Sequence, residues 1–454
     1  MSEAYAAKLQ KTHTLVWMFL GMLLYKFFMD LGYLYLTRVS DYILAFNPLK
    51  YAAGLLWCIV LFLAIRHTER KASTFFLYFI FLFQIVPITS VYAMKDESSS
   101  YYHLLCLSFL LCELAVSYTG DRPIFRRTFP VSRAMTLAFT AAALLLLVYL
   151  VLKNGAPKWS LLDTSTVYEY RTSGALQLSK YMSYLLQWTA KVFLPFGIAK
   201  SLVDRRYPAA GLLMAALLLV YLYTGMKGYL FAIPFILVFT LWARRKNCYQ
   251  ELFLTGCAGF SVLTLLAYFT RPGSPWYYLF SLFVRRVMVL SSQLKFQYFD
   301  YFTSHPKLGI YGILPTWILK VPSYYEDVGY TYDIAAIYYN KPEMNANTGF
   351  FAEGYMRFGY IGIILLPLLL ALLLKLMDRF QDRAGYTLTI GMFIFPILIL
   401  SDGHLLDSFV FGNWMFLTVI LLFYRPRRMP PEPPSLRLRR RRLVLRLPAL
   451  RLRS

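Results

Sequence analysis

Four arginines lie in two long segments between apolar runs, where they could bind a phosphate group. They are Arg171, Arg285, Arg286 and Arg357. A guanidinium presents paired donors that match the oxygens of a phosphate or pyrophosphate. The set therefore predicts one anionic ligand. The alternative is that each side chain snorkels toward lipid headgroups or pairs with a nearby carboxylate, such as that of Glu169.

A second signal is the stretch 345–362, where polar, aromatic and small residues precede a strongly apolar run. Glu353 falls at the predicted membrane edge, where a carboxylate is costly unless it is paired or used. It could take a proton in a reaction. It could equally form an ion pair with Arg357, which follows one helical turn later. Three glycines would allow close helix packing, and they are Gly354, Gly359 and Gly362.

The last predicted outer loop, residues 401–407, contains the other candidate proton acceptor. His404 has a side chain suited to proton transfer near neutral pH, and Asp402 and Asp407 flank it. A surface role is the alternative for this histidine. No histidine pair at helical spacing predicts zinc, and no Asp-x-Asp pair predicts a metal that holds a nucleotide sugar. We expect no metal or cofactor.

Apolar runs must position all of these residues. The chain has 454 residues, of which 58% are hydrophobic and 15% charged, whereas a soluble domain carries roughly 25% charged residues. Runs long enough to cross about 30 Å of hydrocarbon recur throughout. The fold class predicted is an all-α polytopic membrane protein with about twelve transmembrane helices. The predicted spans are 15–36, 51–65, 73–93, 102–119, 134–152, 183–200, 208–223, 229–243, 251–269, 358–377, 386–401 and 408–424.

Positive charge predicts the orientation of these spans. Every second connection is basic, and the tail 425–454 carries eleven arginines against one glutamate. Basic connections mark the cytoplasmic side, so both termini are expected there and the long segments 153–182 and 270–357 on the outer side. The same rule accounts for the net charge of +24 without nucleic acid. The predicted domains are residues 1–424, one helical domain with both outer segments, and the Arg- and Pro-rich tail, which could touch anionic lipids.

The outer segments contain aromatic residues and little net charge, which predicts folding against the membrane rather than disorder. Residues 276–302, rich in Tyr and Phe, are expected to form an amphipathic helix that lies in the interface.

Three pieces of the sequence resemble the Wzy-type family of O-antigen, or oligosaccharide repeat-unit, polymerases. They are Tyr168-Glu-Tyr-Arg171, the Arg285-Arg286 pair with the following residues 298–306, and the stretch 347–362. The span count and the two long outer segments extend the likeness over most of the chain. The family's Arg-x10-Gly pattern is not met from Arg171, because position 182 is Met.

The resemblance implies a GT-C-like architecture in the bacterial inner membrane and a metal-independent glycosyltransferase with a periplasmic active site. The donor would be a glycan on undecaprenyl pyrophosphate, and the acceptor a lipid-linked repeat unit. The arginines would bind the pyrophosphate, and Glu353 or His404 would take the hydroxyl proton. A chain-length regulator is a further expected partner. The residues expected to contact sugar are Tyr168, Tyr324, Tyr325, Tyr330 and Asn347.

Three other functions remain open at this point. An oligosaccharide ligase of related architecture would use the same donor with a different acceptor. A polyprenyl-monophosphosugar transferase would need an acidic residue in the first outer loop, where Asp41 is available. A lipid-linked oligosaccharide transporter would bury charges within spans, and Asp30 with Lys26 is the clearest such pair. Internal symmetry between halves, which would favour transport, is not visible in the sequence.

Overall fold

The computed structural model describes most of the chain. The described residues are 3–65, 70–118, 132–163, 166–167, 170, 176, 178–311, 313, 325, 329–400, 403–406, 409 and 413–424. Within these ranges the chain forms helices joined by short connections, and it forms no β-strand. The all-α prediction is therefore confirmed for the described part of the chain.

The helices follow one another from the N-terminus to the C-terminus with few interruptions. The first half contains α1 (Glu3–Val39), α2 (Pro48–Ala64), α3 (Ala72–Ile80), η1 (Phe81–Ile85), α4 (Val86–Met94), α5 (Ser99–Tyr118), α6 (Ser132–Asn154), η2 (Trp159–Leu162), α8 (Lys180–Trp188), η3 (Thr189–Phe193), α9 (Leu194–Val203) and α10 (Tyr207–Thr224). The second half contains α11 (Lys227–Trp242), α12 (Cys248–Phe269), α13 (Pro275–Phe280), η4 (Ser281–Leu290), α14 (Ser291–Ser304), α15 (Tyr330–Tyr339), α16 (Phe350–Ala384), α17 (Tyr386–Ile399) and α19 (Trp414–Phe423).

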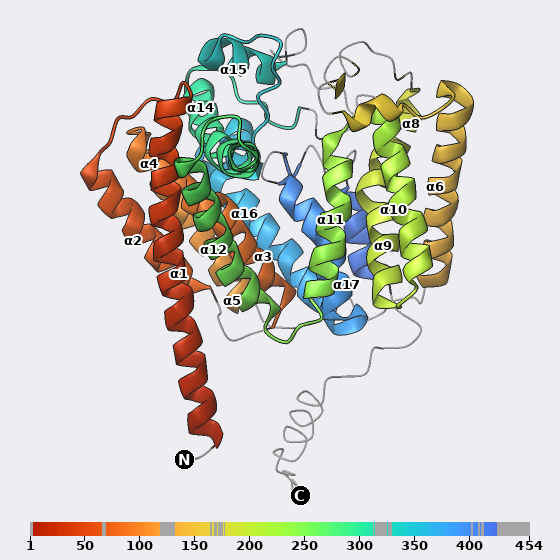
Figure 1. Ribbon diagram of the computed structural model, residues 1–454, viewed down its shortest axis with the longest axis horizontal. Helices are drawn as coiled ribbons and strands as arrows, with labels where there is room; N and C mark the ends of the chain where they lie inside the picture. Colours follow the sequence, from red (N-terminus) through yellow and green to blue (C-terminus); the bar gives the residue numbers. More distant parts are fainter. Residues whose placement is uncertain are drawn as a thin grey trace, which may run out of the picture.

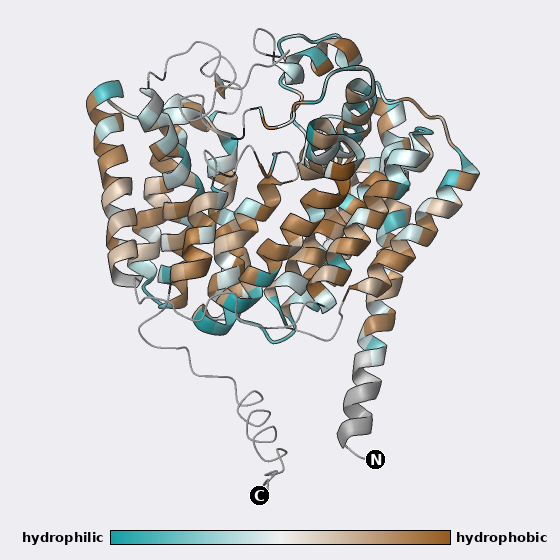
Figure 2. Ribbon diagram, turned by 180° about the vertical axis from the view of Figure 1, so that it is seen from behind, coloured by the Kyte–Doolittle hydropathy of each residue, from teal (hydrophilic) through white to brown (hydrophobic). Residues whose placement is uncertain are grey.

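Seven described helices are long and apolar enough to cross a membrane, and four shorter apolar helices accompany them. Hydrophobic residues fill the middle of the bundle and hydrophilic residues gather toward its two ends (Figure 2). This distribution is that of a polytopic membrane protein. Helices overlap all twelve predicted runs, but only the seven meet the length and hydropathy expected of a span. The number twelve stays a prediction.

The helices form two groups that meet at α16 and α17. One group contains α1 to α5 and α12, and the other contains α6 and α8 to α11 (Figure 1). Within the first group α1 packs along α12 and α5 packs along α16, whereas α17 packs against α9 and α11 of the second group. The start of α16 and the end of α17 therefore lie where the two groups meet.

The basic connections gather at one end of the bundle. Arg70 Nη2 donates to the Ala243 carbonyl (2.9 Å), and Gln381 Nε2 donates to the Arg70 carbonyl (3.0 Å). The opposite end carries α15, while the N-terminal turns of α1 extend past the basic end (Figure 1). The described basic connections thus share one end, as the alternating charge predicted.

The helix predicted over residues 276–302 exists, but its second half is not an interfacial surface helix. Residues 275–304 form one continuous helix of α13, η4 and α14, and η4 is a π-helix. Figure 1 shows this part nearly end-on, so it runs across the other helices. Tyr298 and Phe302 of α14 are buried against neighbouring helices. Aromatic periodicity suits an interface and a helix contact equally well, which explains the error.

A sharp bend divides α16 after its first two turns. Gly359 has φ 63° and ψ −144°, a conformation that residues with a Cβ rarely adopt. Across the bend, the backbones of Gly354 and Gly362 touch, and a Cβ at either position would overlap the other residue's carbonyl. The predicted role in close packing is therefore confirmed for Gly354 and Gly362, whereas Gly359 forms the bend. They let the short segment 350–358 pack against the long helix that follows.

We expect Gly362→Ala to destabilise the protein, because its methyl group would collide with the Gly354 carbonyl. Overpacking of this kind costs about 1–3 kcal/mol, seen as a lower thermal midpoint in detergent and a lower yield of monodisperse protein. Gly211→Ala is the matched control, since nothing lies within 4 Å of a Cβ added there. Equal midpoints for the two variants would show that the close approach is not structurally important.

Candidate functional site

Glu353 lies in the first turn of α16, and its side chain is completely buried. Its carboxylate accepts hydrogen bonds from the backbone N–H of Leu405 (2.6 Å) and of Leu406 (3.0 Å). It also accepts one from Arg357 Nε (3.2 Å). Bonds to an ionised acceptor are stronger than neutral ones. Glu353 therefore ties the start of α16 to the loop 403–406.

Arg357 completes this connection from the next helical turn. Its side chain is 2% exposed, and Nη1 donates to the carbonyls of Gly309 (2.9 Å) and Tyr311 (2.8 Å). The backbone N–H of Gly309 donates in return to the Arg357 carbonyl (3.0 Å). The predicted ion pair with Glu353 is confirmed. A pyrophosphate at this guanidinium would have to displace two backbone acceptors, so the contacts favour a positioning role, and pyrophosphate binding by Arg357 stays a prediction.

His404 lies beside this pair, within a group of aromatic rings. Its Nδ1 is 3.4 Å from the Tyr330 hydroxyl oxygen. The centroids of the Tyr330 and Tyr298 rings lie 6.3 and 6.5 Å from its own ring. The Tyr298 hydroxyl donates to the Ala346 carbonyl (2.8 Å), just before α16. The structure therefore brings both predicted proton acceptors, Glu353 and His404, into one site.

The protonation state of His404 follows from its surroundings. Burial, together with the positive charge of Arg357, lowers the pKa of His404 to about 3. The imidazole is therefore neutral at physiological pH, and it is a weak proton acceptor. Of the two predicted acceptors, Glu353 is the stronger candidate for proton transfer. His404 is better suited to hydrogen bonding.

The low pKa of His404 predicts a pH-dependent stability. The unfolded state protonates this histidine below about pH 6.5, whereas the folded state stays neutral. Because the unfolded state binds more protons, stability falls as the pH decreases, by about 2 kcal/mol at pH 5. Between about pH 7.5 and pH 5, the thermal midpoint of wild type should therefore decrease more than that of His404→Gln. Parallel midpoint curves would show that His404 is accessible to protons in the folded state.

The other predicted sugar contacts differ in exposure. Tyr325 is buried, its hydroxyl donates to the Pro306 carbonyl (2.7 Å), and its ring packs against Phe302 and Tyr330. Its contacts support a packing role. Asn347 is exposed on the approach to α16. Sugar contact by both residues stays a prediction.

The structure does not bring Arg285 and Arg286 to the Glu353 site. Both lie in η4. Arg285 is partly buried, and its Nε donates a hydrogen bond to the Ser281 hydroxyl (2.8 Å), whereas Arg286 is exposed. Arg285 precedes Tyr298 by thirteen residues of one continuous helix, which is about 20 Å along the axis. The convergence of all four arginines on one ligand stays a prediction. Five further candidates lie outside the described residues, namely Tyr168, Arg171, Tyr324, Asp402 and Asp407.

Two features of this region were not predicted from the sequence, namely two backbone amides and one buried glutamine. The backbone amides of Leu405 and Leu406 carry no sequence signal, because any residue supplies an N–H group. Gln84, which lies close to the start of α16, did carry a signal. It is the lone amide in the apolar run 75–88, and a polar residue inside a predicted span marks a functional candidate.

No group of three or more His, Cys, Asp or Glu side chains in the described ranges could hold a metal ion. No family model, curated protein or solved structure matches the chain.

Proposed function

We propose that the protein polymerises lipid-linked oligosaccharide repeat units by glycosyl transfer. One observation carries the proposal. The buried Glu353–Arg357 pair joins the two sequence segments with candidate proton acceptors, α16 and the loop 403–406, beside a group of tyrosines. This site lies at the end of the bundle opposite the described basic connections.

In the proposed reaction an acceptor sugar hydroxyl attacks the anomeric carbon of the donor glycan. The new glycosidic bond forms as the bond to the lipid pyrophosphate breaks, and the hydroxyl proton passes to Glu353. Negative charge accumulates on the departing pyrophosphate, where the guanidinium group of Arg171 would stabilise it. Arg285 and Arg286 lie about 20 Å along the helix axis from Tyr298, which is beside the Glu353 site, so they would bind the pyrophosphate of the acceptor, which the repeat unit separates from the attacking hydroxyl. Lipid-linked substrates would enter sideways between helices. Neither metal nor cofactor takes part.

The proposal includes the compartment. Because basic connections face the cytoplasm, the Glu353 site would face the periplasm of a bacterial inner membrane, with both termini inside. The GT-C-like architecture, the twelve spans and a partner that regulates chain length belong to the same proposal. The orientation is supported by the described basic connections, which contact one another at one end of the bundle through Arg70, Ala243 and Gln381.

The decisive experiment is reconstitution of the purified protein in proteoliposomes with undecaprenyl-pyrophosphate-linked repeat units. We expect a ladder of glycans and release of undecaprenyl pyrophosphate, unchanged by a metal chelator. A ligase would form no ladder and would transfer glycan only to an added second acceptor, and a transporter would move substrate without forming a bond. Either result would overturn the proposal. A deletion strain should keep one repeat unit on its surface polysaccharide and lose the longer chains.

A further inference from the structure

Gln84 is a buried amide at the centre of a long helix. It lies in the π-helix η1, between α3 and α4, about midway along the continuous helix that runs from Ala72 to Met94. Its side chain is 3% exposed. Neither Oε1 nor Nε2 has a hydrogen-bond partner among the described residues. Leaving both groups of an amide without hydrogen bonds in an apolar interior costs free energy. A hydrogen-bonding group that is not among the described residues would therefore be stabilised beside Gln84.

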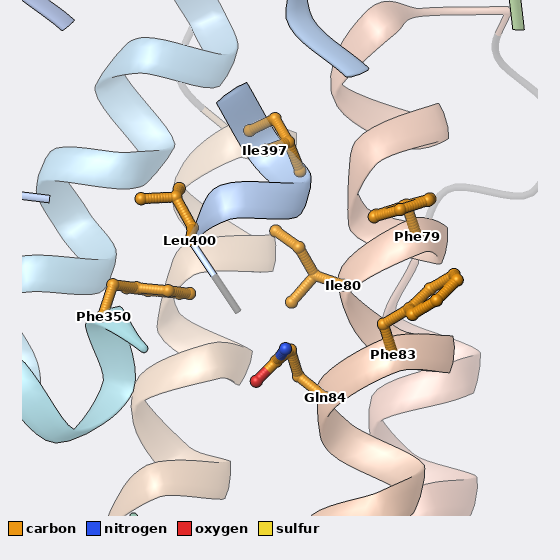
Figure 3. Close-up of a pocket in the computed structure, with 7 residues that line it drawn as sticks. All are labelled: Phe79, Ile80, Phe83, Gln84, Phe350, Ile397 and Leu400. Carbon is orange, nitrogen blue, oxygen red and sulfur yellow. The ribbon is translucent and has the colours of Figure 1, made fainter. Parts of the chain in front are cut away.

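The Gln84 amide lines a small cavity with room for about one water molecule. Figure 3 shows the amide directed into the space between Ile80, Phe350 and Leu400. The remaining lining residues, Phe79, Phe83 and Ile397, are apolar. Gln84 is therefore the one polar side chain among the seven residues that line this cavity.

The cavity adjoins the Glu353 site. Phe350 precedes Glu353 by one helical turn, and Leu400 precedes His404 by four residues. The Phe350 N–H donates to the Leu400 carbonyl (3.2 Å), which holds the start of α16 against the end of α17. The cavity and the Glu353 site therefore share the start of α16 and lie on either side of this contact along the chain.

The π-helical turn gives Gln84 its position. A π-turn inserts an extra residue into an α-helix, and such turns recur at functional sites. In η1 the Leu82 carbonyl accepts from the Tyr25 hydroxyl (2.8 Å), whose oxygen also lies 3.4 Å from Met288 Sδ in η4. Tyr25 thus ties η1 to η4, the helix segment that carries Arg285.

We propose that the Gln84 amide binds one hydroxyl group of the substrate glycan and so selects among sugars. This inference rests on the proposed function and adds a specificity-determining residue to it. A hydroxyl both donates and accepts, which matches the two halves of an amide. It also replaces the single water that the cavity can hold. The cavity has room for the hydroxyl alone, so the sugar ring that carries it would lie outside the cavity.

Other ligand groups fit this cavity less well. An isoprenoid chain would fill apolar space but leave the amide unbonded. A phosphate oxygen would bring negative charge beside a neutral side chain among apolar residues, where that charge is poorly stabilised. The proposed ligand is therefore a neutral hydroxyl group.

The test compares wild type with Gln84→Leu in proteoliposomes supplied with lipid-linked repeat units. We expect KM to rise about tenfold to a hundredfold, with kcat little changed. The thermal midpoint should stay the same or rise, because an unbonded amide is replaced by an apolar side chain. Repeat units that each lack one hydroxyl extend the test. One of them should be a poor substrate for wild type and no worse than the full repeat unit for Gln84→Leu.

Thr189→Val is the matched control. Thr189 lies in another π-helix, η3, is fully buried and has no hydroxyl partner among the described residues, but it does not line the cavity. It should leave KM unchanged. If Gln84→Leu also leaves KM and the preference among deoxy substrates unchanged while a ladder forms, the inference fails and the polymerase proposal stands.

Binding measured without turnover separates the two proposals further. Undecaprenyl-pyrophosphate-linked repeat units should raise the thermal midpoint of wild type in detergent more than that of Gln84→Leu. If no ladder forms but this difference is found, the hydroxyl site stands and the polymerase proposal fails. If the repeat unit shifts both midpoints equally, the hydroxyl site is overturned.

Discussion

Glu353→Gln is expected to reduce the polymerisation rate by at least a factor of about 100. The substitution keeps the shape of the side chain but turns one acceptor oxygen into a donor. An NH2 group would then face a backbone N–H, from Leu405 or Leu406, or the Arg357 guanidinium. The loss of charge also leaves the Arg357 cation buried without its carboxylate, which costs several kcal/mol in comparable pairs, about 3–5. The substitution would therefore weaken the contacts that hold the loop 403–406 and remove the group that accepts the proton.

The measurement is the initial rate of ladder formation at equal amounts of inserted protein. Asp204→Asn is the control, because Asp204 also pairs with a basic residue four positions away, Lys200, but both side chains are partly exposed. Exposed ion pairs contribute little to the stability of the fold, about 0–1 kcal/mol, so this variant should keep wild-type activity. Full activity of Glu353→Gln would remove Glu353 from the reaction and from loop positioning alike.

The pH dependence of kcat distinguishes the two roles of Glu353. If the carboxylate takes the hydroxyl proton, the acidic limb of the kcat profile disappears in Glu353→Gln. If it only positions the loop, the limb persists at a lower rate and the thermal midpoint falls in parallel. Arg357→Met serves as the comparison, since it removes the other member of the ion pair together with its bonds to residues 309 and 311, and leaves the carboxylate in place.

Local features of this site were predictable from the sequence, because helix geometry fixes them. The spacing of Glu353 and Arg357 predicts an ion pair on any helix, and the apolar run after Gly359 predicts a helix into the bundle. The contacts of this pair with other segments were not predictable. They depend on the loop 403–406 and the segment 308–311 reaching the same turn of α16, which only tertiary packing decides.

The burial of α14 shows a different limit. Tyr298 and Phe302 have the composition of an interfacial helix, and nothing in that pattern reveals that other helices cover them. The depth of Gln84 was predictable from its place in an apolar run. The cavity beside it was not, because a cavity is a property of how three helices fit together and no single segment encodes it.

Arg285→Ala is expected to abolish long glycans, with a rate loss of about 100-fold or more. Arg285 is held in place by the Ser281 hydroxyl and is partly exposed, so its guanidinium is oriented and still within reach of a ligand. A fixed cation at this distance from Glu353 would bind the pyrophosphate of the acceptor and so hold the acceptor hydroxyl in position for attack. Arg285→Lys should be intermediate, since an ammonium keeps the charge but loses the paired donors.

Arg271→Ala is the matched control for this prediction. Arg271 is an exposed arginine in the turn between α12 and α13, at the same end of the bundle as η4, and a general loss of positive charge there would affect both variants equally. We expect Arg271→Ala to retain activity. If both variants make full-length glycan, Arg285 does not bind the pyrophosphate. If both fail equally, attraction of the anionic substrate by the whole surface, rather than a specific contact with Arg285, explains the effect.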